Sequence, residues 1–192
     1  MGDLEEWQAE YKWDGIRGQF IRRNNEVFIW SRGEELVNTQ FPELVSALEK
    51  MEGNFVVDGE VLAVKEEEVL NLNELQKRLN RKTISAKMMK DIPIQAFVYD
   101  LLEFEGEDFR GKPLIERRLK LEEVLENAEV QNFKLPEIII AKSWEELAEI
   151  RLKSRHNNSE GLMLKQKNSL YHSGRKKGDW WKWKVDALTI DA

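Results

Sequence analysis

The first strand-like segment of this 192-residue chain, and the turn that follows it, constrain the fold most. Trp7, Ala9 and Tyr11 alternate with polar residues, as in a half-buried strand, and Asp14-Gly15 then predicts a turn. Lys12 therefore lies near the end of a strand, held beside a turn. A lysine amine in such a place becomes a nucleophile once it loses its proton. The segment predicts a β-rich framework that carries a candidate nucleophile.

The Lys-x-Asp-Gly pattern is too short to identify a chemistry alone, since a surface hairpin with a solvated lysine would look the same. Four later apolar segments, each strand-like, supply possible partners. They are Val56–Leu62 with Asp58-Gly59-Glu60, Phe97–Leu102 with Tyr99, Ser159–Lys165 with Glu160, and Trp180–Val185 with Lys182 and Lys184. The two lysines of the last segment are two residues apart and therefore point to one face of a strand. Its three tryptophans predict that this strand is substantially covered.

Helical patterns separate these strands. Apolar spacing, a first-turn proline or a capping box predicts helices over residues 39–51, 71–81, 113–127 and 143–154. Ile138-Ile139-Ile140 predicts a short buried strand. Strands mixed with helices, without regular β-α alternation, indicate an α+β fold.

Composition narrows the class of function. Thirty-six acidic against thirty basic residues give a net charge of -6, which argues against a general nucleic-acid binder. The charge is uneven, because residues 163–184 hold seven Lys or Arg against Asp179, and residues 77–82 form a second basic run on a helix. These runs suit a polyanion bound along one face, although two solvated basic faces would give the same pattern. The absence of cysteine excludes a disulfide scaffold, and no segment resembles a signal peptide or membrane span.

The five strand segments, in this order, resemble the covalent nucleotidyltransferase superfamily, most closely the adenylation domain of ATP-dependent DNA ligases. The resemblance extends from about Trp7 to Asp186. It implies an α+β fold of two antiparallel β-sheets flanked by helices, with the nucleotide cleft between them in an ATP-grasp-like arrangement. It also implies ATP and Mg²⁺ as cofactors and nicked double-stranded DNA as partner, in DNA replication, repair or recombination. We expect a monomer, cytoplasmic in a bacterium or archaeon and nuclear in a eukaryote.

The resemblance assigns roles to particular residues. Lys12 matches the nucleophile that attacks the α-phosphate of ATP and holds AMP. The expected nucleotide-binding residues are Glu10 at the adenine amino group, Arg17 and Arg32 at ribose or phosphate, Glu60 at the ribose, Tyr99 against the adenine ring, Glu160, Lys182 and Lys184. The expected metal ligands are Glu160 and Glu60, and the expected contacts with DNA or phosphate are Arg32, Arg175, Lys176 and Lys177. The family usually has Phe where this chain has Tyr99.

We expect residues 1–192 to form one adenylation domain. The downstream OB-fold domain of the family, and the upstream DNA-binding domain of many members, are absent from this sequence, so we expect weak sealing of nicks by this chain alone. Two alternatives stay open. An RNA ligase or an mRNA capping guanylyltransferase shares Lys-x-Asp-Gly, and a non-catalytic nucleotide- or DNA-binding module would belong to another class.

Overall fold

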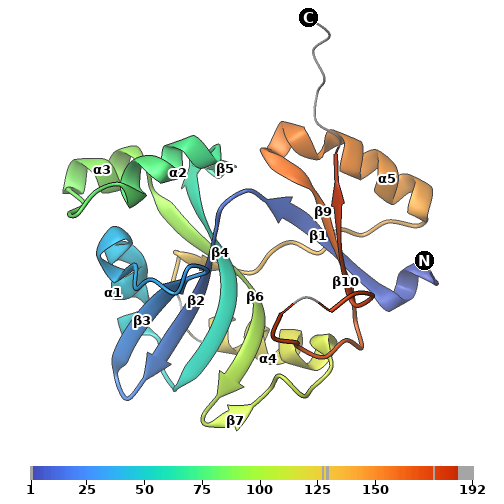
Figure 1. The fold of residues 1–192 in the computed structure, drawn as a ribbon, viewed down its shortest axis with the longest axis horizontal. Coiled ribbons are helices and arrows are strands. Elements are labelled where there is room, and N and C mark those ends of the chain that lie inside the picture. The colour runs from blue at the N-terminus through green and yellow to red at the C-terminus, as the bar shows by residue number, and fades with distance from the viewer. Residues whose placement is uncertain (1, 127, 129, 175, 186–192) are drawn as a thin grey trace, which may run out of the picture.

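The chain folds into two β-sheets flanked by helices, as the computed structural model shows for residues 2–126, 128, 130–174 and 176–185 (Figure 1). The small sheet has the strand order β1-β9-β10 and the large sheet β3-β2-β4-β6-β7, with β5 beside β4 and β8 beside β6. The pairs are antiparallel except β6 with β8. The α+β fold with two sheets is therefore confirmed.

The strands of the small sheet are β1 (Trp7–Trp13), β9 (Ser159–Gln166) and β10 (Trp180–Lys184). Those of the large sheet and its edges are β2 (Ile16–Arg23), β3 (Glu26–Ser31), β4 (Phe55–Lys65), β5 (Glu68–Val69), β6 (Ile94–Phe104), β7 (Glu107–Asp108) and β8 (Phe133–Lys134). The helices are α1 (Pro42–Lys50), α2 (Leu72–Leu79), α3 (Ala86–Asp91), α4 (Leu114–Glu126) and α5 (Trp144–Lys153), with 3-10 turns at Leu4–Glu6, Asn38–Gln40 and Ser154–Asn157.

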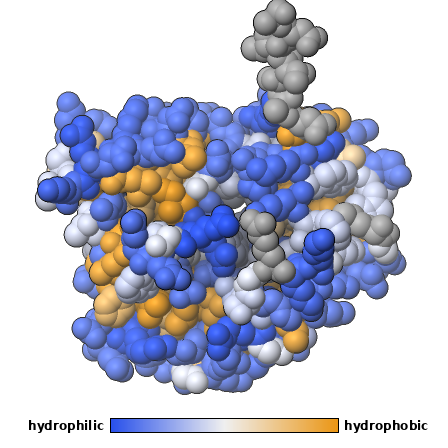
Figure 2. Space-filling view, in the orientation of Figure 1, coloured by the Kyte–Doolittle hydropathy of each residue, from blue (hydrophilic) through white to orange (hydrophobic). Residues whose placement is uncertain are grey.

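Each sheet buries its own apolar cluster. The larger cluster packs the inner face of β2, β4 and β6 against α1 and α4, with Phe20, Leu48 and Leu121 fully buried. The smaller one lies between the small sheet and α5, where Leu147 meets Leu162 and Leu164. Figure 2 shows apolar side chains gathered over the half of the molecule that holds the large sheet. Hydrophilic side chains dominate the boundary between the two sheets, which we call the seam.

The chain crosses between the two sheets at Asp14-Gly15, where β1 leads into β2 (Figure 1). A Cβ on Gly15 would collide with the carbonyl oxygen of Val61 and with the side chains of Leu62 and Glu60. Only glycine fits so close to β4, which explains the glycine after Asp14. The crossing places the end of β1, with Lys12, directly beside the large sheet.

The four predicted helices are confirmed as α1, α2, α4 and α5, whereas the sequence did not predict α3. The predicted strand at Ile138–Ile140 is wrong: a single β-bridge joins Ile139 to Ala9, and Ile140 is 82 % exposed. The expectation that β10 is covered fails at Trp181, which is 45 % exposed at the edge of the small sheet. No helix in the described ranges has the length and apolarity that crossing a membrane requires.

The basic run at residues 77–82 does not form one solvated face, because Arg78 is fully buried. Its guanidinium pairs with the carboxylate of Glu43 and donates to the carbonyl oxygens of Gln40, at 2.9 Å, and Ile92, at 3.0 Å. This side chain links α2 to α1, and because it is buried it is not available to bind a polyanion.

Candidate active site

The candidate site begins with the end of β1, where Lys12 faces the seam between the sheets. Its ammonium pairs with the carboxylate of Glu160 on β9, and both side chains are partly buried. Lys184 of β10 also reaches Glu160, at 3.0 Å. The hydrogen bonds from Lys12 and Lys184 outweigh the effect of burial and hold the pKa of Glu160 below its usual value. One carboxylate is therefore shared by two lysines from neighbouring strands.

An irregularity in the small sheet directs Glu160 toward the site. The register between β1 and β9 shifts between Tyr11 and Trp13, and Gly161 has a φ of 138°. A Cβ on Gly161 would collide with the carbonyl oxygen of Trp183 on β10. This bulge needs glycine at that position, and bulges often redirect a neighbouring side chain. The bulge therefore explains why a glycine follows Glu160 in the sequence.

The large sheet contributes Glu60 from β4. Burial raises the pKa of Glu60 to about 7, although the positive charge of Lys12 and a hydrogen bond from the backbone N–H of Gly15 act in the opposite direction. Asp14 adds a further negative charge nearby. Glu60 therefore lies within electrostatic reach of Lys12, on the other side of the seam.

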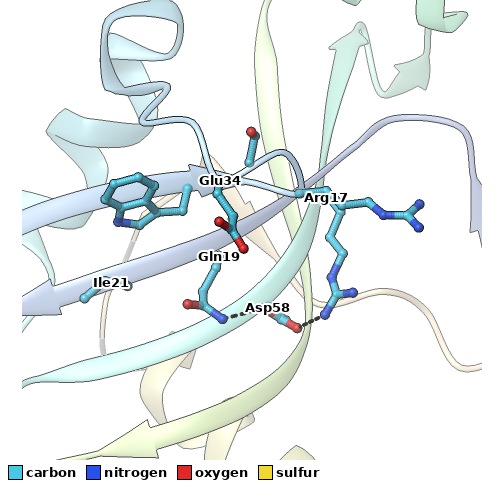
Figure 3. Close-up of a pocket in the computed structure, with 8 residues that line it drawn as sticks. Arg17, Gln19, Ile21, Glu34 and Asp58 are labelled. Carbon is cyan, nitrogen blue, oxygen red and sulfur yellow. Dashed lines mark hydrogen bonds and ion pairs between the residues drawn. The ribbon is translucent and has the colours of Figure 1, made fainter. Parts of the chain in front are cut away.

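Arg17 of β2 forms a second cluster on the large sheet. Its NH2 donates to Oδ2 of Asp58, at 2.5 Å, and to the hydroxyl of Tyr171, at 3.0 Å. Gln19 also points to Asp58 (Figure 3). Desolvation lowers the pKa of Arg17, but electrostatic interactions with Tyr99, Asp58 and Tyr171 and the hydrogen bond to Asp58 together raise it above its usual value. This guanidinium stays a cation.

A surface hollow of about 420 Å³ lies beside this cluster. It is lined by Arg17, Gln19, Ile21, Trp30, Ser31, Arg32, Glu34 and Asp58 (Figure 3). Arg32 comes from the turn after β3 and is exposed. Two guanidinium groups in one hollow can bind a phosphate, because the planar donor fork matches its oxygens.

Lys165 links Glu10 to Tyr99 in a buried network of contacts. Oε2 of Glu10 accepts a hydrogen bond of 2.6 Å from Nζ of Lys165, and Oε1 accepts one of 2.6 Å from Gln8. The Lys165 ammonium also lies 4.5 Å from the ring centre of Tyr99 and 4.5 Å from that of Trp180. Burial raises the pKa of Tyr99 well above its usual value, so its hydroxyl keeps its proton.

The remaining predicted residues lie farther along the basic segment. Lys182 and Lys184 share the exposed edge strand β10, and Lys176 and Lys177 are exposed in the loop before it. Lys176 pairs with Asp179, at 3.0 Å. Arg175, a predicted contact with phosphate, lies outside the described residues.

The structure also brings in residues that the sequence did not single out. Asp58 was visible inside the Asp-Gly-Glu segment, but nothing in the pattern distinguished it from its neighbour Glu60. Tyr171 lies in a loop, far from every strand motif, and only the fold brings it to Arg17. Lys165 was included in the basic run at residues 163–184, but its side chain is 2 % exposed and forms an ion pair with Glu10.

The carboxylates of Glu60 and Glu160 are suitable ligands for a divalent cation. Glu60 and Glu160 are carboxylates on either side of Lys12, and Mg²⁺ prefers oxygen ligands, often one or two carboxylates with substrate phosphates completing the shell. Within the described residues, no group of three or more acidic, His or Cys side chains could hold a metal by itself.

The sequence matches the family described as "ATP dependent DNA ligase domain" over residues 3–184. A DNA ligase of Acidianus ambivalens is 34 % identical over 184 residues, which cover 93 % of this chain and 30 % of that protein. A probable DNA ligase of Koribacter versatilis is 31 % identical over 213 residues, which cover the whole of this chain and 37 % of the relative. The chain thus spans about a third of the length of these relatives.

Solved structures agree with this match. The ligase domain from M. tuberculosis LigD superimposes with a TM-score of 0.73 and 25 % identity, over 92 % of this chain and 54 % of that one. A Chlorella virus DNA ligase-adenylate shares the fold, with a TM-score of 0.66 at 16 % identity. The fold is thus that of the nucleotidyltransferase domain of DNA ligases. The chain belongs to the ATP-dependent DNA ligase domain family.

Proposed function

We propose that this chain activates a DNA 5′-phosphate by carrying AMP on Lys12. The amine of Lys12 attacks the α-phosphorus of ATP, an N–P bond forms, and the bond to pyrophosphate breaks. AMP then passes to the 5′-phosphate at a nick, and the neighbouring 3′-hydroxyl displaces it as the phosphodiester bond forms. The chain acts as a monomer in this proposal.

The cluster of Lys12, Glu160 and Lys184 carries the proposal. Lys12 must lose a proton to attack, and the neighbouring cation of Lys184 favours that loss, while the Glu160 carboxylate holds both amines in place. Lys184 remains as a cation beside the same carboxylate and stabilises negative charge that develops on the phosphoryl oxygens. Lys182 lies on the same face of β10 and adds to this field.

The other predicted residues fit around this centre. Glu60 accepts or donates a hydrogen bond at the ribose, and Tyr99 supplies the aromatic surface for adenine. Glu10 contributes to the adenine end through its network with Lys165 and Gln8. Mg²⁺, bound to ATP and to Glu60 or Glu160, would neutralise phosphate charge. Arg32, with Lys176 and Lys177, contacts the DNA backbone.

Label transfer tests the proposal. Incubation with ATP labelled at the α-phosphate, followed by denaturing electrophoresis, should leave label on the protein, and mass spectrometry should place AMP on the peptide that contains Lys12. Lys12→Ala and Lys12→Arg should lose at least about a thousandfold in rate, because alanine has no amine and arginine keeps its proton.

Four outcomes would separate the alternatives. Undiminished labelling of Lys12→Ala would remove Lys12 as the nucleophile. Preferential labelling by GTP would indicate a guanylyltransferase, and joining of RNA but not DNA ends an RNA ligase. Failure to form any covalent nucleotide would favour a binding module.

A further inference from the structure

We propose that Tyr171 is a positioning residue that holds Arg17 so that half of its guanidinium is presented to a phosphate group in the hollow beside it. The inference rests on the proposed function, because the phosphate belongs either to ATP or to the 5′ end of DNA. It concerns a residue outside every strand segment that the sequence analysis used.

The geometry at Arg17 divides its donors into two sets. NH2 is occupied by Asp58 Oδ2, at 2.5 Å, and by the Tyr171 hydroxyl, at 3.0 Å. Among the residues that the structure describes, none accepts a hydrogen bond from Nε or NH1 of Arg17. The side chain is 46 % exposed and lines the hollow. One side of the fork is therefore anchored, and the other can bind an anion.

Asp58 explains why a phenol is needed there. Its side chain is 1 % exposed and lies at the hollow, where an uncompensated carboxylate would repel phosphate. The Tyr171 hydroxyl donates to Oδ2 of Asp58, at 2.7 Å, and shares that oxygen with Arg17. Burial, then the charge of Asp58, raises the pKa of Tyr171, so the phenol remains a donor. Glu34 also lines the hollow but is exposed.

The loop that carries Tyr171 is anchored at Ser169 and at the backbone of Tyr171. The carbonyl oxygen of Ser169 accepts from the buried Arg117, at 2.9 Å, and Trp180 donates to the Ser169 hydroxyl, at 3.1 Å. The backbone N–H of Tyr171 itself donates to the carbonyl oxygen of Arg110, at 3.0 Å. Arg117 is held in turn by Asp100, with both side chains fully buried. These hydrogen bonds hold the backbone of Tyr171 beside the large sheet, where its hydroxyl contacts Asp58 and Arg17.

Tyr171→Phe tests the role, since it removes only the hydroxyl. One arm measures binding of a nicked duplex with a 5′-phosphate and of the same duplex with a 5′-hydroxyl, by fluorescence anisotropy at low salt without ATP. The other arm measures the KM for ATP in label transfer. We expect about a tenfold loss, either in the preference for the 5′-phosphate or in the KM for ATP, since charge-assisted hydrogen bonds are strong. The arm that changes identifies the source of the phosphate.

Two further variants separate positioning from a general structural effect. Tyr11→Phe, on the opposite face of β1 from Lys12, should leave both arms unchanged. In an Arg17→Lys background, Tyr171→Phe should have little further effect, because the fork that it positions is gone. A preference for the 5′-phosphate and a KM for ATP that both stay within twofold of the unaltered chain would overturn the inference. Absence of Lys12-dependent label in the unaltered chain would instead overturn the proposed function.

Discussion

Two lysine–glutamate pairs join β1 to β9 in the small sheet, and their surroundings differ sharply. Glu10 and Lys165 are 3 % and 2 % exposed, whereas Lys12 and Glu160 are 15 % and 30 % exposed. Glu10 and Lys12 are only two residues apart and lie on the same strand face. The same two residue types therefore occur once inside the protein and once at the seam.

The difference teaches that charge type alone does not identify a reactive group. The rings of Tyr99 and Trp180 lie against the Lys165 ammonium and Gln8 donates to Glu10, so the buried pair also links the small sheet to Tyr99 on the large sheet. The partly exposed pair shares its carboxylate with a third group, Lys184, and can rearrange around a ligand. Mutations in the two pairs should therefore affect different properties.

Glu160→Gln should lower the rate of label transfer by about a hundredfold, the largest effect expected after the loss of Lys12 itself. The neutral amide no longer pairs with Lys12 and Lys184, and loss of one such charged group in a site commonly costs a few kcal/mol in the transition state. The free energy of unfolding should change by less than about 1 kcal/mol, since partly exposed pairs contribute little. Glu123→Gln, at an exposed ion pair on α4, is the matched control. A normal rate for Glu160→Gln would remove it from the proposed chemistry.

Lys165→Met should reverse the pattern. It leaves the buried Glu10 carboxylate with the more distant guanidinium of Arg118, whose Nη1 lies 3.9 Å from Oε1, and breaking a buried pair commonly destabilises a protein by about 3–5 kcal/mol. Urea denaturation should detect this loss, and adding Glu10→Gln should recover most of it, because the buried charge is then removed. Lys184→Met, at the exposed edge, should cost less than about 1 kcal/mol. Equal losses for the two lysine variants would erase the distinction between the pairs.

The sequence predicted much of this arrangement and missed a definable part. Local patterns predicted four of the helices and the strands that carry Lys12, Glu60, Glu160 and Lys184, but they missed α3 and predicted a strand at residues 138–140 that does not form. Burial could not be predicted in the same way. Arg78 looks like one residue of a basic face, and only the packing of α2 on α1 shows that it is enclosed.

Long-range contacts account for the other omissions. Tyr171 and Asp58 are 113 residues apart, and no periodicity links them. The isoleucines at 138–140 have strand-like composition, but Ala9 at the edge of β1 pairs with a single residue there. Strand propensity describes a side chain that fits a half-buried surface, and it does not supply the partner strand.

The pH dependence of stability should show the smallest effect, and it concerns Glu60 on the large-sheet side of the seam. Burial raises its pKa from 4.5 to about 7 in the folded protein. Between these values the unfolded chain loses the proton while the folded one keeps it, so stability falls as pH rises from 4.5 to 7 and levels off above that. The shift corresponds to at most about 3 kcal/mol. Glu160, whose pKa is lowered, acts in the opposite direction but below this window.

Urea denaturation at pH 5 and pH 8 should show the fall in the unaltered chain and much less of it in Glu60→Gln. An identical pH dependence in both would mean that the Glu60 carboxyl titrates as it does in water, and that the large-sheet side of the site is more hydrated than the structure shows.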